Sequence, residues 1–147
     1  MSVSRRQALI HAPPGRIWEL VGEPRRHPEW WPRVIEVRGQ TFDEGSNYAQ
    51  VTRSPTGRIE TTMNVEKLDD LSEIHMRCLD TGTYARWLLT EAQGETFVDV
   101  EFGMDPRGAT SRIFDAAVGR LYFRRWLDQS LAALEEVVAQ PETTTAR

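Results

Sequence analysis

Hydrophobic and polar positions alternate along most of the chain between residues 33 and 104. A period of two is typical of strands with one buried face, and the short turns between them contain Asp, Gly or Pro. Connections this short join antiparallel neighbours. The six alternating segments are residues 33–41, 47–53, 58–68, 73–79, 83–92 and 95–104. Together with a more polar first segment at residues 2–11, they predict a seven-stranded curved antiparallel sheet.

A helical period replaces this alternation over residues 110–139, and Pro141 marks the end of that stretch. Its apolar residues fall on one side when successive residues are turned by about 100°. That stripe consists of Ile113, Ala117, Leu127, Leu131, Leu134 and Val138. Two shorter helices are expected after the first strand, at residues 16–21 and 25–30. The pattern predicts an α+β fold in which a curved sheet wraps around one long C-terminal helix.

The alternation assigns one dry face and one wet face to the predicted sheet. The wet face carries charged and amide side chains, among them Gln50 and His75. The dry face is expected to consist of Ile35, Val37, Ala49, Val51, Ile59, Thr61, Met63, Val65, Ile74, Met76, Cys78, Ala85, Trp87, Leu89, Val98, Val100 and Phe102. This face must be covered, and the long helix is the element large enough to cover it.

The opening of the chain resembles a known superfamily. The motifs are Ile10-His11-Ala12-Pro13, then Ile-Trp-Glu-Leu-Val at residues 17–21, then Pro-Glu-Trp-Trp-Pro-Arg-Val at residues 28–34. They are similar to the opening of the START/Bet v 1-like (SRPBCC) superfamily, in its polyketide cyclase/dehydrase and lipid-transport branch. The order of elements also matches the helix-grip fold of that superfamily over nearly the whole chain. We therefore expect one such domain at residues 1–140 and a flexible tail at residues 141–147.

The resemblance implies a hydrophobic cavity between the sheet and the long helix. Members bind lipids, sterols, polyketides or plant hormones, and a minority catalyse cyclisation or aromatisation. The branch shares a fold more than a catalytic residue, so no catalytic residue is carried over. The residues expected to contact a ligand are Trp30, Trp31, Tyr48, Thr61, Met63, Met76, Trp87, Val100, Phe102, Ile113, Ala117, Arg120 and Arg124.

Two groups of these residues carry specific expectations. Trp30 and Trp31, flanked by prolines, are expected near the pocket entrance, since Trp offers a large flat contact area. Arg120 and Arg124 fall within the apolar stripe of the long helix. Each either snorkels to the helix edge or reaches into the pocket to meet an anionic ligand group. Thr61 is a polar side chain expected near the ligand, and Tyr48 is another if the alternation of its strand is displaced by one residue.

Composition narrows the class of protein. The 147 residues carry a formal net charge of −4, which argues against a dedicated binder of nucleic acid or anionic membranes. Cys78 is alone, so no internal disulfide forms, and no apolar run is long enough to span a bilayer. The first eleven residues are too polar for a signal peptide. A cytoplasmic location is expected.

Chemistry-bearing motifs are missing from the sequence. It has no Gly-x-Ser-x-Gly elbow, no His-Glu-x-x-His and no phosphate-binding glycine loop. His11, His27 and His75 lie in three separate predicted elements. The dry face offers few titratable groups, whereas general acid–base catalysis needs one at the reacting atom. We predict no catalytic residue, metal or cofactor.

Three functional hypotheses follow. The leading one is a carrier or binding protein for a hydrophobic small molecule such as a lipid, a polyketide or another aromatic or isoprenoid-like metabolite. An alternative is a polyketide cyclase or aromatase that uses the same cavity, because orientation of a substrate can itself accelerate a reaction. A second alternative is a protein-interaction module with a filled core. A homodimer through Tyr122 and Trp126 is a further hypothesis.

Overall fold

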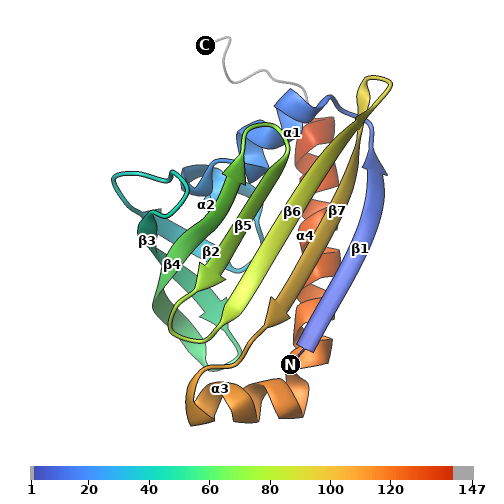
Figure 1. Ribbon diagram of the computed structural model, residues 1–147. Coiled ribbons are helices and arrows are strands. Elements are labelled where there is room, and N and C mark those ends of the chain that lie inside the picture. Colours follow the sequence, from blue (N-terminus) through green and yellow to red (C-terminus); the bar gives the residue numbers. More distant parts are fainter. Residues whose placement is uncertain (1, 141–147) are drawn as a thin grey trace.

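A computed structural model describes residues 2–140 of the protein. Seven strands form one antiparallel sheet in the order β1-β7-β6-β5-β4-β3-β2, and the sheet covers one side of a long C-terminal helix (Figure 1). The strands are β1 (Ser2–Ile10), β2 (Val34–Arg38), β3 (Asn47–Ser54), β4 (Gly57–Asp69), β5 (Glu73–Cys78), β6 (Thr83–Ala92) and β7 (Glu95–Met104). This arrangement confirms the predicted helix-grip fold. The predicted tail at residues 141–147 lies outside the described residues.

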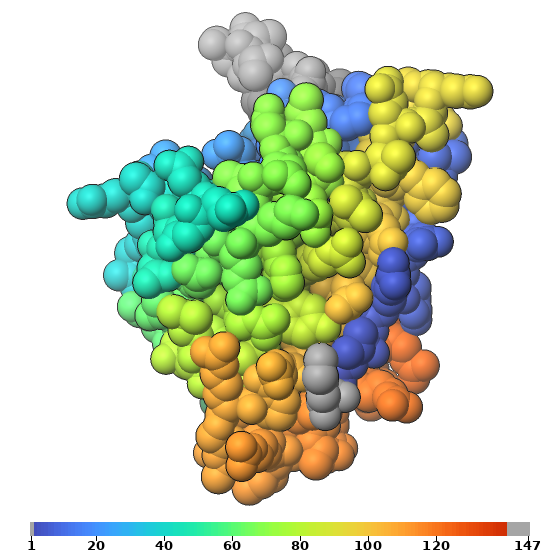
Figure 2. All heavy atoms as spheres, viewed as in Figure 1, coloured from blue at the N-terminus to red at the C-terminus, as the bar shows by residue number. Residues whose placement is uncertain are grey.

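The sheet and the C-terminal helix form two layers, here called the sandwich, and shorter helices lie at its two ends (Figure 1). The segment after β1 forms α1 (Pro14–Val21), a 3-10 turn η1 (Pro24–Arg26) and α2 (His27–Trp30). The C-terminal helix runs through α3 (Gly108–Phe114), the π-helical segment η2 (Asp115–Gly119) and α4 (Arg120–Ala139). α1 lies at the end of the sheet near the β6–β7 hairpin, and α3 projects beyond the sheet at the opposite end (Figures 1 and 2). Within residues 2–140, no helix combines the length and apolar character needed to cross a membrane.

Aromatic side chains fill the space between the sheet and α4. Trp31 lies at their centre, stacked on Trp30 at 5.6 Å and on Trp126 at 5.7 Å between ring centroids. Trp87 of β6 and Phe102 of β7 meet the same ring from the sheet side at 5.6 and 5.5 Å. Such ring pairs stabilise the fold by about 0.5–1.5 kcal/mol each beyond their buried area. This cluster makes one half of the sandwich solid.

The predicted face of β3 is wrong by one residue, and in β2 the prediction is wrong for Ile35 but right for Val37, which packs against the core. Directly opposite residues in antiparallel strands point to the same face, and Gln50 lies opposite Thr61. Gln50 is therefore buried against the helix side, whereas Ala49 and Val51 are only half-buried. In β2 a bulge between Val34 and Glu36 shifts the alternation, so that Val34 rather than Ile35 faces inward. The alternation rule assigns polar residues to the outer face of a sheet, so it fails for β3, where polar residues face inward.

The C-terminal helix departs from the regular period that the prediction assumed. The π-helical segment η2 accommodates an extra residue compared with an α-helical turn. It therefore rotates the side chains of α3 about the helix axis relative to those of α4. Buried positions consequently recur every fourth residue through this region, at Ser111, Asp115, Gly119, Phe123 and Leu127. Ile113 is 69% exposed, and Ala117, Arg120 and Arg124 are exposed as well. The predicted placement of Ile113 and Ala117 towards a pocket is therefore wrong. For Arg120 and Arg124 the structure agrees with the alternative in which they stay at the helix surface.

Candidate functional site

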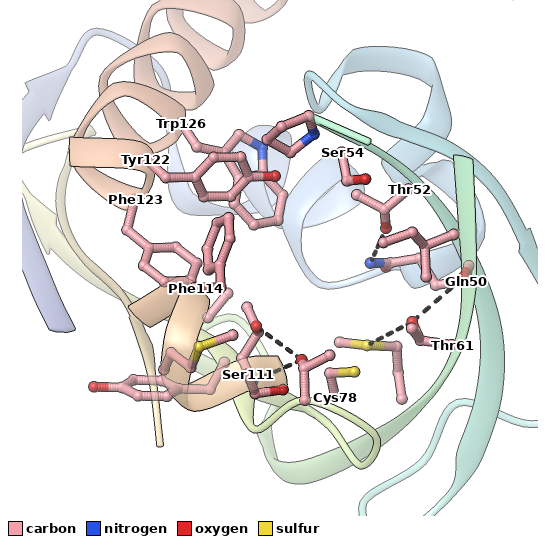
Figure 3. Close-up of a pocket in the computed structure, with 18 of the residues that line it drawn as sticks. Gln50, Thr52, Ser54, Thr61, Cys78, Ser111, Phe114, Tyr122, Phe123 and Trp126 are labelled. Atoms are coloured by element: carbon pink, nitrogen blue, oxygen red, sulfur yellow. Dashed lines mark hydrogen bonds between the residues drawn. The ribbon is translucent and has the colours of Figure 1, made fainter. Parts of the chain in front are cut away.

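A cavity of about 280 Å³ lies between the sheet and the C-terminal helix, in the half that the aromatic cluster leaves open (Figure 3). Strands β3 to β7 form its floor, and α3 and α4 form its roof. Trp31 and Trp126, both buried, bound its inner end. The exposed lining residues Pro55, Thr56 and Thr110 mark its open end, between the β3–β4 hairpin and α3. Its size lies at the lower end of the range of small-molecule pockets, about 300–1,000 Å³.

One wall of the cavity is polar but uncharged. Gln50, Thr52 and Ser54 of β3 line it in succession, with Thr61 of β4 beside them (Figure 3). The Gln50 side-chain amide donates to the Thr52 hydroxyl at 3.1 Å, and the Thr61 hydroxyl donates to the Gln50 carbonyl at 3.4 Å. These contacts hold the stripe in place, and each hydroxyl oxygen keeps a lone pair for another donor.

The opposite side of the cavity is mostly apolar, with the hydroxyl groups of Thr110 and Ser111 in α3 among the exceptions. Phe114, Tyr122, Phe123 and Trp126 face the polar stripe from the C-terminal helix (Figure 3). The sheet adds Met63, Met76, Cys78, Ala85 and Met104. No Asp, Glu, Lys, Arg or His stands among the lining residues that the structure describes. A ligand group that enters the cavity therefore meets apolar surface and neutral hydrogen-bonding groups, and no ionic partner.

Trp31, at the inner end of the cavity, contains a buried polar atom. Its indole N–H is buried and has no hydrogen-bond partner among the described residues, whereas the N–H of Trp126 donates to the Pro32 carbonyl at 2.6 Å. Trp31 is the one lining residue of the described chain with such an unsatisfied buried side-chain atom. Because this N–H is itself buried, it is not exposed on the cavity wall.

The residues predicted from the sequence divide into three groups. Trp31, Thr61, Met63 and Met76 line the cavity. The second group is buried but lies outside the cavity wall and consists of Trp30, Tyr48, Trp87, Val100 and Phe102. The third group, on the outer surface, consists of Ile113, Ala117, Arg120 and Arg124. Trp30 and Trp31 lie at the inner end of the sandwich, so their predicted place near the entrance is wrong.

Sequence reasoning missed the polar stripe and the aromatic roof. Gln50, Thr52 and Ser54 share a spacing of two with Tyr48, and that spacing was the available signal for one face. Trp126 was assigned to a dimer surface, but it is only 5% exposed and its ring packs on Phe102 at 5.1 Å. The residue therefore cannot present the flat surface that the dimer hypothesis requires.

The histidines lie away from the cavity wall. His27 is fully buried under Trp30 and Trp31, and burial lowers its pKa to about 4 despite a 2.8 Å contact between its Nε2 and the Val21 carbonyl. His75 pairs with Glu66 at 3.2 Å on the outer face of the sheet, and burial lowers its pKa. Among residues 2–140, no three His, Cys, Asp or Glu side chains come close enough to hold a metal ion.

A second hollow of about 510 Å³, here called the groove, adjoins the open end of the cavity. Arg33, Arg53 and Arg125 line it together with Val118 and Leu121. Ser54, Pro55 and Tyr122 line both this groove and the cavity. The two hollows are therefore neighbours that share a wall.

Comparisons with known proteins agree with this fold. The model of the family described as "Polyketide cyclase / dehydrase and lipid transport" matches residues 1–139. A START superfamily protein from Mycobacterium smegmatis has a similar structure, with a TM-score of 0.73 and 13% identity over 95% of this chain and 99% of that one. The Polyketide_cyc-like protein Cgl2372 from Corynebacterium glutamicum has a TM-score of 0.57 and 16% identity, over 93% and 85%. A comparison with curated proteins gave no match.

Proposed function

Because the chain belongs to the polyketide cyclase / dehydrase and lipid transport family, we propose that it is a carrier or binding protein for a hydrophobic small molecule. Its family and its fold are consistent with hydrophobic ligand binding of the START/Bet v 1-like kind. The ligand would occupy the cavity between the sheet and the C-terminal helix. Its class is a lipid, a polyketide or another aromatic or isoprenoid-like metabolite.

The observation that carries this proposal is the uncharged wall of the cavity. Met63, Met76 and Phe123 offer apolar contact, while Gln50 and Thr61 offer neutral hydrogen bonds. Burial of a charged group there would cost several kcal/mol, because no ion partner lines the wall. An apolar molecule with one or two carbonyl or hydroxyl groups fits this wall, because Gln50 and Thr61 can form hydrogen bonds with such groups.

The other two hypotheses have less support. A cyclase or aromatase would need a titratable group beside its substrate, and the described lining offers only Cys78 and tyrosines in place of a carboxylate, imidazole or amine. Such an enzyme would have to work mainly through substrate orientation. A protein-interaction module with a filled core would leave no space between sheet and helix, and the cavity weighs against that hypothesis.

Native mass spectrometry tests the proposal. Gently purified protein should show a bound mass that disappears when the same sample is denatured, and the identity of that mass distinguishes a lipid from a polyketide. Protein that arrives unliganded should be titrated with neutral lipids and with aromatic polyketides. Failure of every such compound to bind or to raise the melting temperature would contradict the proposed function.

A further inference from the structure

The groove beside the cavity mouth is built from three separate parts of the chain. The β3–β4 hairpin contributes Arg53, Ser54 and Pro55, and the junction of η2 with α4 contributes Val118, Leu121, Tyr122 and Arg125. Arg33, just before β2, completes the groove. Val118 and Leu121 are 45% and 46% exposed, so apolar surface lies in the open among three positive charges.

The three arginines of the groove differ from most cations of the sheet in their partners. Elsewhere the sheet pairs its cations closely, as Arg77 with Glu66 at 2.9 Å and Arg86 with Glu73 at 2.8 Å. No carboxylate within residues 2–140 forms an ion pair with the guanidinium of any of the three groove arginines. Like charges that share one groove repel each other, and an anion placed between them removes that repulsion.

Arg33 is held in an unusual way. Its φ of 75° lies in the left-handed region that residues with side chains seldom adopt and that is frequent at functional sites. The Arg33 guanidinium lies over the Tyr122 ring at 4.6 Å and donates to the Gln129 side chain at 3.3 Å. The Arg53 backbone N–H donates to the Arg33 carbonyl at 2.7 Å, which ties the two arginines together. Because Tyr122 lines both hollows, this charge is fixed where cavity and groove meet.

We propose that the groove formed by Arg33, Arg53 and Arg125 binds the anionic head group, a carboxylate or a phosphate, of an amphiphile whose apolar part occupies the cavity. This inference rests on the proposed function. A guanidinium offers several N–H donors in a plane that matches the oxygens of either anion. The uncharged cavity and the cationic groove share Ser54, Pro55 and Tyr122, so one molecule spans both.

The chain supplies its own matched control. Arg120 and Arg124 lie on the same helical segment as Arg125 and are exposed, but they line neither hollow. The variants R53Q/R125Q and R120Q/R124Q each remove two positive charges from this end of the molecule. Only the first pair removes charge from the groove, where Arg33 remains, whereas a general electrostatic effect would act on both variants alike.

Isothermal titration with decanoic acid and methyl decanoate tests the inference, with circular dichroism to verify that each variant is folded. The wild type should bind the acid more tightly than the ester. R53Q/R125Q should weaken binding of the acid by about tenfold and leave the ester unchanged, as loss of two charge-assisted contacts predicts. R120Q/R124Q should leave both affinities within about twofold of the wild type. Titration with decyl phosphate then shows which of the two anions the groove prefers.

Two results would overturn the inference while the proposed function stands. One is equal binding of acid and ester by the wild type, and the other is an equal loss of acid binding in the two double variants. If neither probe binds and native mass spectrometry shows no ligand, the proposed function itself fails and the inference fails with it.

Discussion

At the scale of single residues, the burial of His27 determines the protonation state of the inner end of the sandwich. His27 is 0% exposed and packs edge-on against Trp31, with 4.9 Å between ring centroids. Burial disfavours the charged imidazolium, so His27 is neutral near pH 7 and its pKa is lowered to about 4. The ring thus acts as part of the aromatic core, directly behind the indole that ends the cavity.

The lowered pKa of His27 makes the stability of the fold depend on pH. In the unfolded chain His27 takes up a proton below about pH 6.5, whereas in the folded protein it does so only near pH 4. The free energy of unfolding should therefore fall by about 3 kcal/mol between these two values as the pH is lowered. Urea denaturation at a series of pH values measures this loss.

The variant His27→Gln isolates that contribution, because it keeps a donor for the Val21 carbonyl without a titrating ring. It should lose much of the pH dependence between pH 6.5 and pH 4. His75 also has a lowered pKa and remains in the variant, so a smaller dependence should persist. A pH profile identical to that of the wild type would show that His27 does not cause the loss.

At the scale of the elements, the π-helical segment η2 determines which side chains reach the cavity. It turns Ser111 and Phe114 inward and leaves Ile113 outside. Gly119 ends this segment against β1, where a Cβ atom would come within 2.7 Å of both Asp115 Oδ1 and Ser2 Oγ. Asp115 and Ser2 are themselves buried and have little room to move. The close approach of helix and strand therefore favours glycine at position 119, since any larger residue would have to displace these two side chains.

The variant Gly119→Ala tests this close packing. Alanine would favour the helix by about 1 kcal/mol, but the overlap with Asp115 and Ser2 should outweigh that gain. We expect the free energy of unfolding to fall by about 1–3 kcal/mol. Gly15→Ala in α1 is the control, because a Cβ there meets nothing within 4 Å and should leave stability unchanged or slightly raised. Equal effects of the two substitutions, measured in urea, would refute the packing argument.

At the scale of the whole molecule, the fold distributes both charge and empty volume unevenly. The net charge of −4 hides a cationic end around the groove, since many of the acidic residues pair with arginines on the sheet. The sandwich is likewise solid at the end of the tryptophans and hollow at the end of α3 (Figure 3). Both properties arise from residues that are distant in the sequence.

Filling the cavity should remove ligand binding without loss of stability. Ala85 of β6 lines the cavity and is 5% exposed, so Ala85→Met would place its longer side chain in the empty space. Native mass spectrometry should then show no bound mass, while the free energy of unfolding stays the same or rises by about 1 kcal/mol. Thr90→Met, on the exposed face of the same strand, should keep the ligand. A bound mass that persists in Ala85→Met would place the ligand elsewhere.

The sequence by itself determined the architecture, because strand and helix periods are local properties and most strands follow them. Thr61, Met63 and Met76, which it predicted to face a ligand, line the cavity, and Trp31 lines it at the inner end rather than at the predicted entrance. Tertiary structure alone decided the face of β3, where pairing of Gln50 with Thr61 overrides the preference of polar residues for water. It likewise decided which arginines meet at the cavity mouth. The π-helical turn that ends at Gly119 rotates the helix, which changes the residues that face the groove. The net charge of the sequence carries no information about where each charge lies in the fold.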